Sequence, residues 1–126
     1  MRYLWIILTA LLLSACTTSG YVDTTTTAIF VQIKGERATL PEAKACEYAG
    51  GQVQRVGMLG YDMCVIPYAD GRKVCTDGSQ CQGQCRTDNF DAYNKTITGQ
   101  CQINNSPFGC YAEVTNGKGA PALCVD

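Results

Sequence analysis

Residues 75–85 read CTDGSQCQGQC, so three cysteines fall within eleven residues that are otherwise polar or glycine. Such a stretch offers no apolar periodicity that a helix or strand could bury. We expect it to be irregular and held by disulfides, as in small exported domains that cannot build a large core. It therefore predicts a small disulfide-stapled fold.

The cysteine count supports this interpretation. The chain holds nine cysteines, and one of them, Cys16, follows an apolar leader. The remaining eight are an even number in about a hundred residues, which predicts four disulfides. Zinc is less well supported, because only Cys81 and Cys85 have the close spacing that structural zinc sites require twice. The eight are Cys46, Cys64, Cys75, Cys81, Cys85, Cys101, Cys110 and Cys124.

A short helix is predicted over about residues 40–49. Thr39 and Glu42 have the spacing of a capping box, and the pair of glycines at 50–51 ends the helix. Cys46 then lies on its inward face. Residues 52–56 and 61–66 are expected to pair as strands, and a Cys46–Cys64 bridge would join the helix to this hairpin.

A second hairpin is predicted near the C-terminal end. Asn116-Gly117, between the strand-like segments 109–114 and 122–125, is a strong hairpin signal. It brings Cys110 next to Cys124. The sequence alone does not choose among the pairings that eight cysteines allow, and Cys75–Cys85 with Cys81–Cys101 is our preferred arrangement for the others. The fold class is therefore a small disulfide-rich α+β domain with one N-terminal helix and antiparallel hairpins.

Residues 1–15 have the features of a bacterial signal peptide. Arg2 gives a positive start, and residues 3–13 form an apolar run that is shorter than the roughly 20 residues of a membrane span. The next residues, up to Cys16, complete the run LSAC, which resembles the lipobox of bacterial lipoproteins. The resemblance implies cleavage before Cys16 and attachment of acyl chains such as palmitate. An ordinary secretory signal or an uncleaved anchor is the alternative.

The lipobox also implies a location. By resemblance to lipoproteins of bacteria with two membranes, Thr17, which is not acidic, favours the outer membrane over the inner one. Residues 16–27 are interpreted as the lipidated cysteine and a flexible tether, because they contain little apolar surface to bury. The disulfide-rich domain then spans residues 28–126 in the periplasm or at the cell surface, and residues 28–33 look like its first strand.

Charge and composition exclude several functions. Ten Lys and Arg against eleven Asp and Glu leave no basic stripe, so we expect no nucleic-acid partner. The chain has no histidine, which removes Ser-His-Asp and Cys-His catalysis. No paired carboxylate site is marked by the sequence. We therefore expect no enzyme activity, no catalytic residue, no metal and no cofactor.

Several motifs resemble a known family. The run ACEYAGG at 45–51, then CVIP at 64–67, then Asp70-Gly71 and Cys75, resembles a family of small bacterial exported proteins of unknown function. Some of its members carry a haemolysin label. The likeness covers roughly residues 43–85, and it implies no catalytic role for any of them.

One loop is a candidate contact site. Met58 and Leu59 stand between glycines in the first hairpin, with Tyr61 beside them. Exposed apolar residues in such a loop are typical of a surface that binds a partner. We therefore expect a membrane-tethered, non-enzymatic interaction or structural module of the bacterial envelope, with an envelope protein or glycan as its partner. The alternative is an inhibitor-like module that presents a disulfide-bounded loop to a protease.

Overall fold

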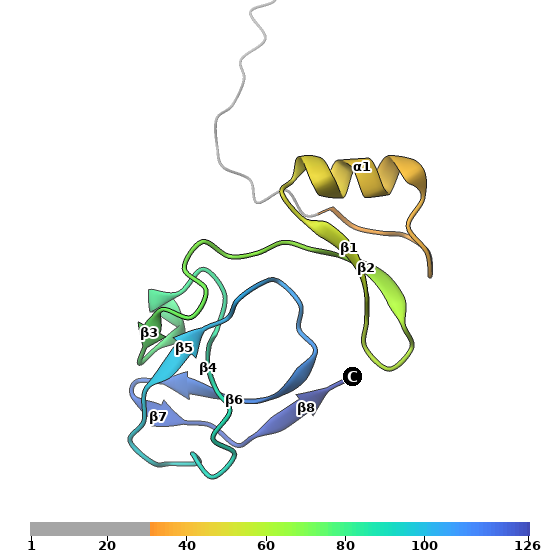
Figure 1. Ribbon diagram of the computed structural model, residues 1–126. Coiled ribbons are helices and arrows are strands. Elements are labelled where there is room, and N and C mark those ends of the chain that lie inside the picture. The colour runs from red at the N-terminus through yellow and green to blue at the C-terminus, as the bar shows by residue number, and fades with distance from the viewer. Residues whose placement is uncertain (1–30) are drawn as a thin grey trace, which may run out of the picture.

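The computed structural model describes residues 31–126. The leader, Cys16 and the tether expected over residues 16–27 lie outside the described residues. No helix in the described part of the chain is long and apolar enough to cross a membrane. Figure 1 shows two parts, a helix lying on a two-stranded hairpin and a larger six-stranded sheet.

Helix α1 spans Leu40–Tyr48 and begins at the predicted capping box. The Thr39 side chain accepts a hydrogen bond from the Glu42 backbone, and the Glu42 carboxylate accepts one from the Thr39 backbone at 2.8 Å. This reciprocal pair satisfies backbone donors that a helix start otherwise leaves unpaired. After the helix, Gly50 has a φ of 78°, which favours glycine and ends the helix as predicted.

The helix packs on an antiparallel hairpin of β1 (Gln52–Val56) and β2 (Tyr61–Val65). Cys46 is the one buried side chain of α1, and its sulfur is bonded to that of Cys64 on β2. Asn105 joins the hairpin to the rest of the molecule. Its side-chain amide accepts from the backbone of Ile66 at 2.8 Å and donates to the Cys64 carbonyl at 3.0 Å.

The larger sheet is built from short strands in the order β3-β5-β4-β6-β7, with β8 also paired to β6. All the strand pairings in it are antiparallel. A 3-10 turn, η1, lies between β3 and β4. The bounds are β3 Val74–Cys75, η1 Gly78–Gln80, β4 Cys85–Thr87, β5 Gly99–Cys101, β6 Gly109–Thr115, β7 Lys118–Gly119 and β8 Leu123–Val125.

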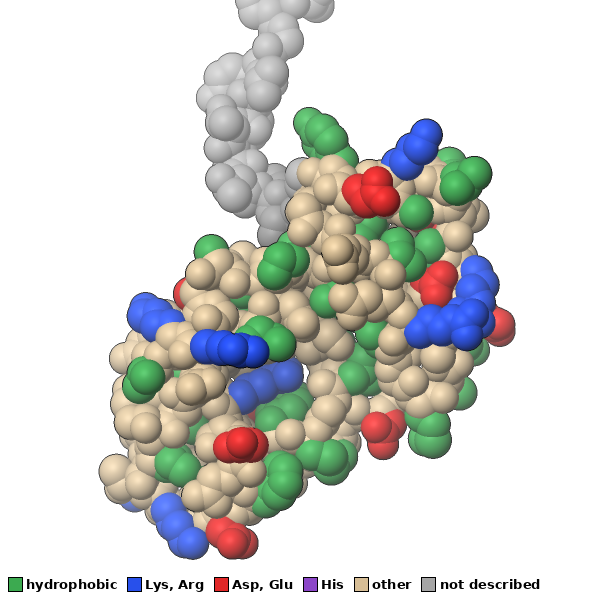
Figure 2. Space-filling model, in the orientation of Figure 1, with side chains coloured by type: hydrophobic (Ala, Val, Ile, Leu, Met, Phe, Trp, Pro, Cys, Tyr) green, Lys and Arg blue, Asp and Glu red, His purple; other side chains and the backbone are tan. Residues whose placement is uncertain are grey.

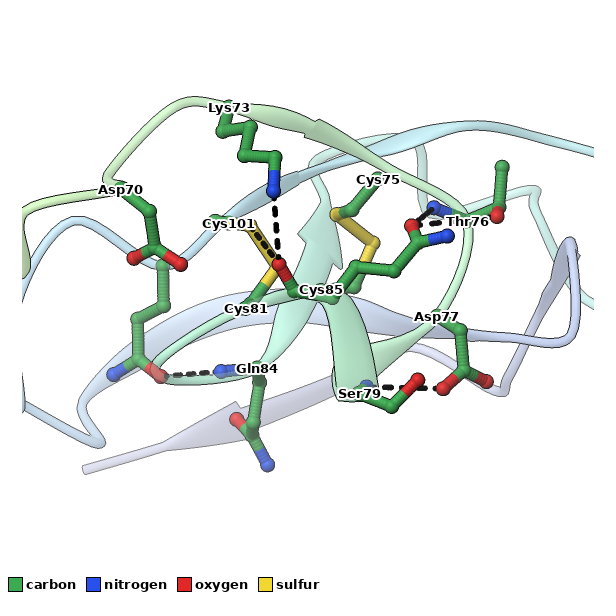
Figure 3. Close-up of a disulfide and its surroundings, with 12 residues drawn as sticks. Asp70, Lys73, Cys75, Thr76, Asp77, Ser79, Cys81, Gln84, Cys85 and Cys101 are labelled. Carbon is green, nitrogen blue, oxygen red and sulfur yellow. Dashed lines mark hydrogen bonds between the residues drawn. A yellow bond between two sulfur atoms is a disulfide. The ribbon is translucent and has the colours of Figure 1, made fainter.

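The core of this sheet is made mainly of sulfur. Cys75, Cys85, Cys101 and Val114 form a buried cluster, and Cys81 packs against it. Figure 3 shows the two bridges side by side, with the Lys73 ammonium reaching a backbone carbonyl next to them. That carbonyl belongs to Gln80 and lies 3.3 Å from the Lys73 nitrogen. Two disulfides thus occupy the place that aliphatic side chains take in larger domains.

The small disulfide-rich α+β fold and all four preferred cysteine pairings are confirmed. The structure contains the bridges Cys46–Cys64, Cys75–Cys85, Cys81–Cys101 and Cys110–Cys124. The Asn116-Gly117 turn is confirmed as well. Both of its residues have positive φ, 51° and 73°, and it joins β6 to β7.

The strand expected at residues 28–33 is wrong for its described part. Residues 31–33 are not in a strand, and the chain bends at residues 35–37. Nearby backbone groups bind elsewhere: the Lys34 amide donates to the Glu42 carboxylate at 3.1 Å, and the Glu36 carbonyl accepts from Asp62 at 3.0 Å. These separate contacts do not make the regular ladder that defines a strand.

Candidate functional site

The hairpin-tip patch, which we define as Met58, Leu59 and Tyr61, is exposed to solvent. The exposed fractions are 81% for Met58, 76% for Leu59 and 44% for Tyr61. Gly57 and Gly60 flank Met58 and Leu59 and have φ of 66° and 64°. A positive φ favours glycine, so the turn that presents Met58 and Leu59 depends on these two positions.

The tip is braced from the other part of the molecule. A Cβ placed on Gly57 would lie 2.7 Å from the ring of Phe108, so the Phe108 ring packs directly on the turn. Beside it lies a groove of about 260 Å³ whose lining includes Leu59, Tyr61, Met63 and Asp126. Figure 1 places the C-terminal end next to this turn. The apolar tip is therefore continuous with a small, mostly apolar groove.

A second and larger groove lies on the six-stranded sheet. It has a volume of about 540 Å³ and is floored by residues of β4, β5 and β6. Ile103 and Phe108, from the segment between β5 and β6, line its rim. Figure 2 shows this face hollowed, with basic and hydrophobic side chains inside the hollow. We call it the Arg86 groove after the cation in its floor.

The Arg86 side chain is half-buried and held by specific contacts. Its guanidinium carbon lies 3.6 Å from the centre of the Tyr111 ring, a stacked cation–π arrangement. Its Nε donates to the Gln84 side-chain oxygen at 2.8 Å, and one terminal nitrogen donates to the same oxygen. Desolvation lowers the pKa of Arg86, opposed by Tyr111 and Glu113. Arginine is nonetheless a cation at neutral pH.

The sequence predicted the hairpin tip as a contact site, whereas the Arg86 groove was not predicted from it. A signal for the groove was present in the short strands, because a core cysteine has as its chain neighbour a residue that points to the other face of the sheet. Cys85 is followed by Arg86, and Cys101 is preceded by Gln100. Because successive strand residues point to opposite sides, a sulfur core on one side places these neighbours together on the other. Reading this requires the strand pairing, which two- and three-residue strands do not reveal.

The sulfur cluster itself has a chemical consequence. The sulfur atoms of Cys75, Cys81 and Cys101 all lie within 4.8 Å of one another. They belong to two different disulfides. Thiol–disulfide exchange needs a thiolate close to a bonded sulfur. If one bridge were opened, the released sulfur would therefore lie next to its neighbour.

Comparisons of this chain with protein-family models, with curated proteins and with solved structures found no match.

Proposed function

We propose that this chain is a membrane-tethered, non-enzymatic interaction module of the bacterial envelope, which uses the hairpin-tip patch to bind a partner protein. The observation that carries the proposal is the exposure of Met58 and Leu59 on a glycine-flanked turn. Large apolar side chains held at a fixed, exposed place lower the cost of ordering an interface.

The chemistry of the patch favours a protein partner over a glycan. Methionine is adaptable and suits apolar protein surfaces, and the adjoining groove is lined largely by apolar residues such as Met63 and Phe108. A partner side chain of aliphatic or aromatic type would fill this groove while Met58 and Leu59 pack around it.

The membrane tether is supported by the sequence. The LSAC run resembles a lipobox, and acylation at Cys16 would give several lipid chains, more than the two signals that stable anchoring requires. The lipid would hold the module at the envelope, with the outer membrane favoured. Replacing Cys16 with serine should release the protein from isolated membranes, and firm attachment of that variant would contradict lipidation.

The test of the interaction is crosslinking in intact cells. A photoreactive residue at position 58 should yield one dominant adduct, identified by mass spectrometry, whereas the same residue at exposed position 90 should not. Met58→Asp and Leu59→Asp should abolish capture of that protein. Phe90→Asp is the matched control, because Phe90 is also an exposed large apolar residue.

Two results would contradict the proposal. One is capture that persists unchanged in both aspartate variants. The other is stoichiometric inhibition of a protease by the purified module without any stable envelope adduct, which would support the inhibitor-like alternative. All three substitutions replace exposed side chains, so unfolding midpoints should stay close to those of the unmodified protein.

A further inference from the structure

We infer that the Arg86 groove is a binding site for a ligand that carries a carboxylate on an apolar body. None of the hairpin-tip patch residues lines this groove, although Phe108 lines both it and the small groove beside the tip. The inference neither needs nor supports the proposed partner. Its volume of about 540 Å³ falls in the range of small-molecule sites.

The strand register assigns the floor of the groove to one face of the sheet. Arg86 on β4 is directly opposite Gln100 on β5 and Glu113 on β6. Cross-strand partners project to the same side, and Tyr111 shares that side because it lies two residues from Glu113. The cysteine cluster fills the opposite side. The Arg86 face therefore stays available for a ligand while the fold is held from behind.

The guanidinium is fixed in place before any ligand arrives. The Tyr111 ring lies against one face of it, and Gln84 takes two of its N–H groups. Among residues 31–126, the Arg86 side chain makes no other hydrogen bond. It also forms no ion pair there, because the one ion pair in this part of the chain joins Arg37 to Asp62. A guanidinium has five N–H donors. Three are thus left for a ligand, and a planar carboxylate matches this donor fork with two parallel bonds.

Nearby charges favour a single negative charge on the ligand. The Glu113 carboxylate accepts a hydrogen bond from the Gln84 side chain, and Asp88 lies on the edge of the groove. Both carboxylates repel a bound anion, and they repel a phosphate dianion about twice as strongly as a monocarboxylate. The groove is therefore better matched to a single negative charge, which pairs with Arg86.

The remaining lining explains the apolar body. Val74 and Ile103 are exposed large apolar residues, and both line the groove together with Phe108 and Tyr111. A ligand whose carboxylate reaches Arg86 would cover this apolar surface and remove it from water. The C-terminal end of a short peptide and a free aromatic acid share this chemistry.

The test is a titration of the oxidised protein followed by NMR. The probes are acetyl-leucyl-phenylalanine with a free carboxylate, the same compound as its C-terminal amide, and 3-phenylpropionate. We expect saturable shifts at the Arg86 side-chain Nε–H and at the amides of residues 99–102 with the acids. The amide should bind about 10-fold to 100-fold more weakly, as expected for loss of charge-assisted hydrogen bonds. Binding of the dipeptide acid points to a peptide end as the source, and binding of phenylpropionate alone points to a free acid.

Variants separate recognition from folding. Arg86→Gln should remove saturable binding, and Arg86→Lys should weaken it about 10-fold or more, because lysine lacks the planar fork. Ile103→Asp keeps Arg86 and its contacts but adds a negative charge at the rim, so it should also weaken binding. Arg55→Gln changes an exposed arginine on β1 and should bind as the unmodified protein does.

Three outcomes would overturn the inference. They are no saturable shift with either acid at millimolar concentration, equal binding of the acid and its amide, and unchanged binding by a folded Arg86→Gln variant.

Discussion

Removing the bridge between α1 and the first hairpin should detach the helix. The double substitution Cys46→Ala and Cys64→Ala deletes the one side chain that α1 buries. The bridge closes a loop of 18 residues, for which the chain-entropy relation gives about 3 kcal/mol of stabilisation. An isolated helix of nine residues is not stable in water, so the capping box cannot hold it alone.

The assay is hydrogen exchange read by mass spectrometry, together with urea unfolding. We expect residues 40–48 to lose nearly all their protection, while β4 and β6 keep theirs. The free energy of unfolding of the whole domain should fall by up to about 3 kcal/mol. The matched control is Cys110→Ala with Cys124→Ala, which removes a bridge of similar loop length, 14 residues, and should leave the helix protected. Full protection of residues 40–48 without the Cys46–Cys64 bridge would refute the reasoning.

Three further predictions concern packing, pH and exchange. Gly119→Ala should destabilise the fold by about 1–3 kcal/mol, because its Cβ would lie 2.3 Å from a backbone oxygen, whereas Gly78→Ala meets nothing within 4 Å and should be nearly neutral in urea unfolding. The pKa of Asp62 is lowered mainly by a hydrogen bond from the Ala38 backbone. The stability that the ionised carboxylate contributes is therefore present above the ordinary carboxyl pKa and is lost as the pH falls through the lowered pKa. Asp62→Asn should reduce the fall in urea midpoint between about pH 5 and pH 2. Cys81→Ser leaves Cys101 as a free thiol beside the Cys75–Cys85 bridge. Attack of the Cys101 thiolate on Cys75 would form a new bridge and free Cys85, so differential alkylation should find the free thiol divided between Cys101 and Cys85. A thiol confined to Cys101 would show that this exchange does not occur.

Local signals in the sequence predicted the parts of the fold that local chemistry determines. Thr39 and Glu42 mark the helix start because their side chains satisfy its backbone, and the Asn116-Gly117 pair marks a tight turn because both positions need positive φ. The predicted helix and the predicted turn also indicated two cysteine pairings. The helix brings Cys46 to Cys64, and the turn brings Cys110 to Cys124.

The six-stranded sheet could not be predicted in the same way. β3 and β7 have two residues each, and β4, β5 and β8 have three, so these five strands are too short to show a period of two; in this sheet β6, with seven residues, is the exception. β5 lies between β3 and β4 although it follows both in the chain, a non-local pairing. The Arg86 groove exists only once that order is known, because its floor is drawn from three strands.

The exposure of the hairpin tip was open to two interpretations from sequence. Met58 and Leu59 are apolar enough to fold back onto a thin core, and only the packing of Phe108 against Gly57 shows why they do not. The Phe108 ring lies against the turn at Gly57. The sequence supplied the residues of the patch, and the tertiary contact determines its orientation.

Disulfides, more than apolar burial, keep residues 31–126 folded. The most direct test is to reduce all four bridges, block the thiols by alkylation, and record near-ultraviolet circular dichroism and urea unfolding at pH 7. We expect the reduced protein to lose its tertiary signal and to show no cooperative transition. A reduced, alkylated protein that keeps that signal and still unfolds cooperatively would contradict the account.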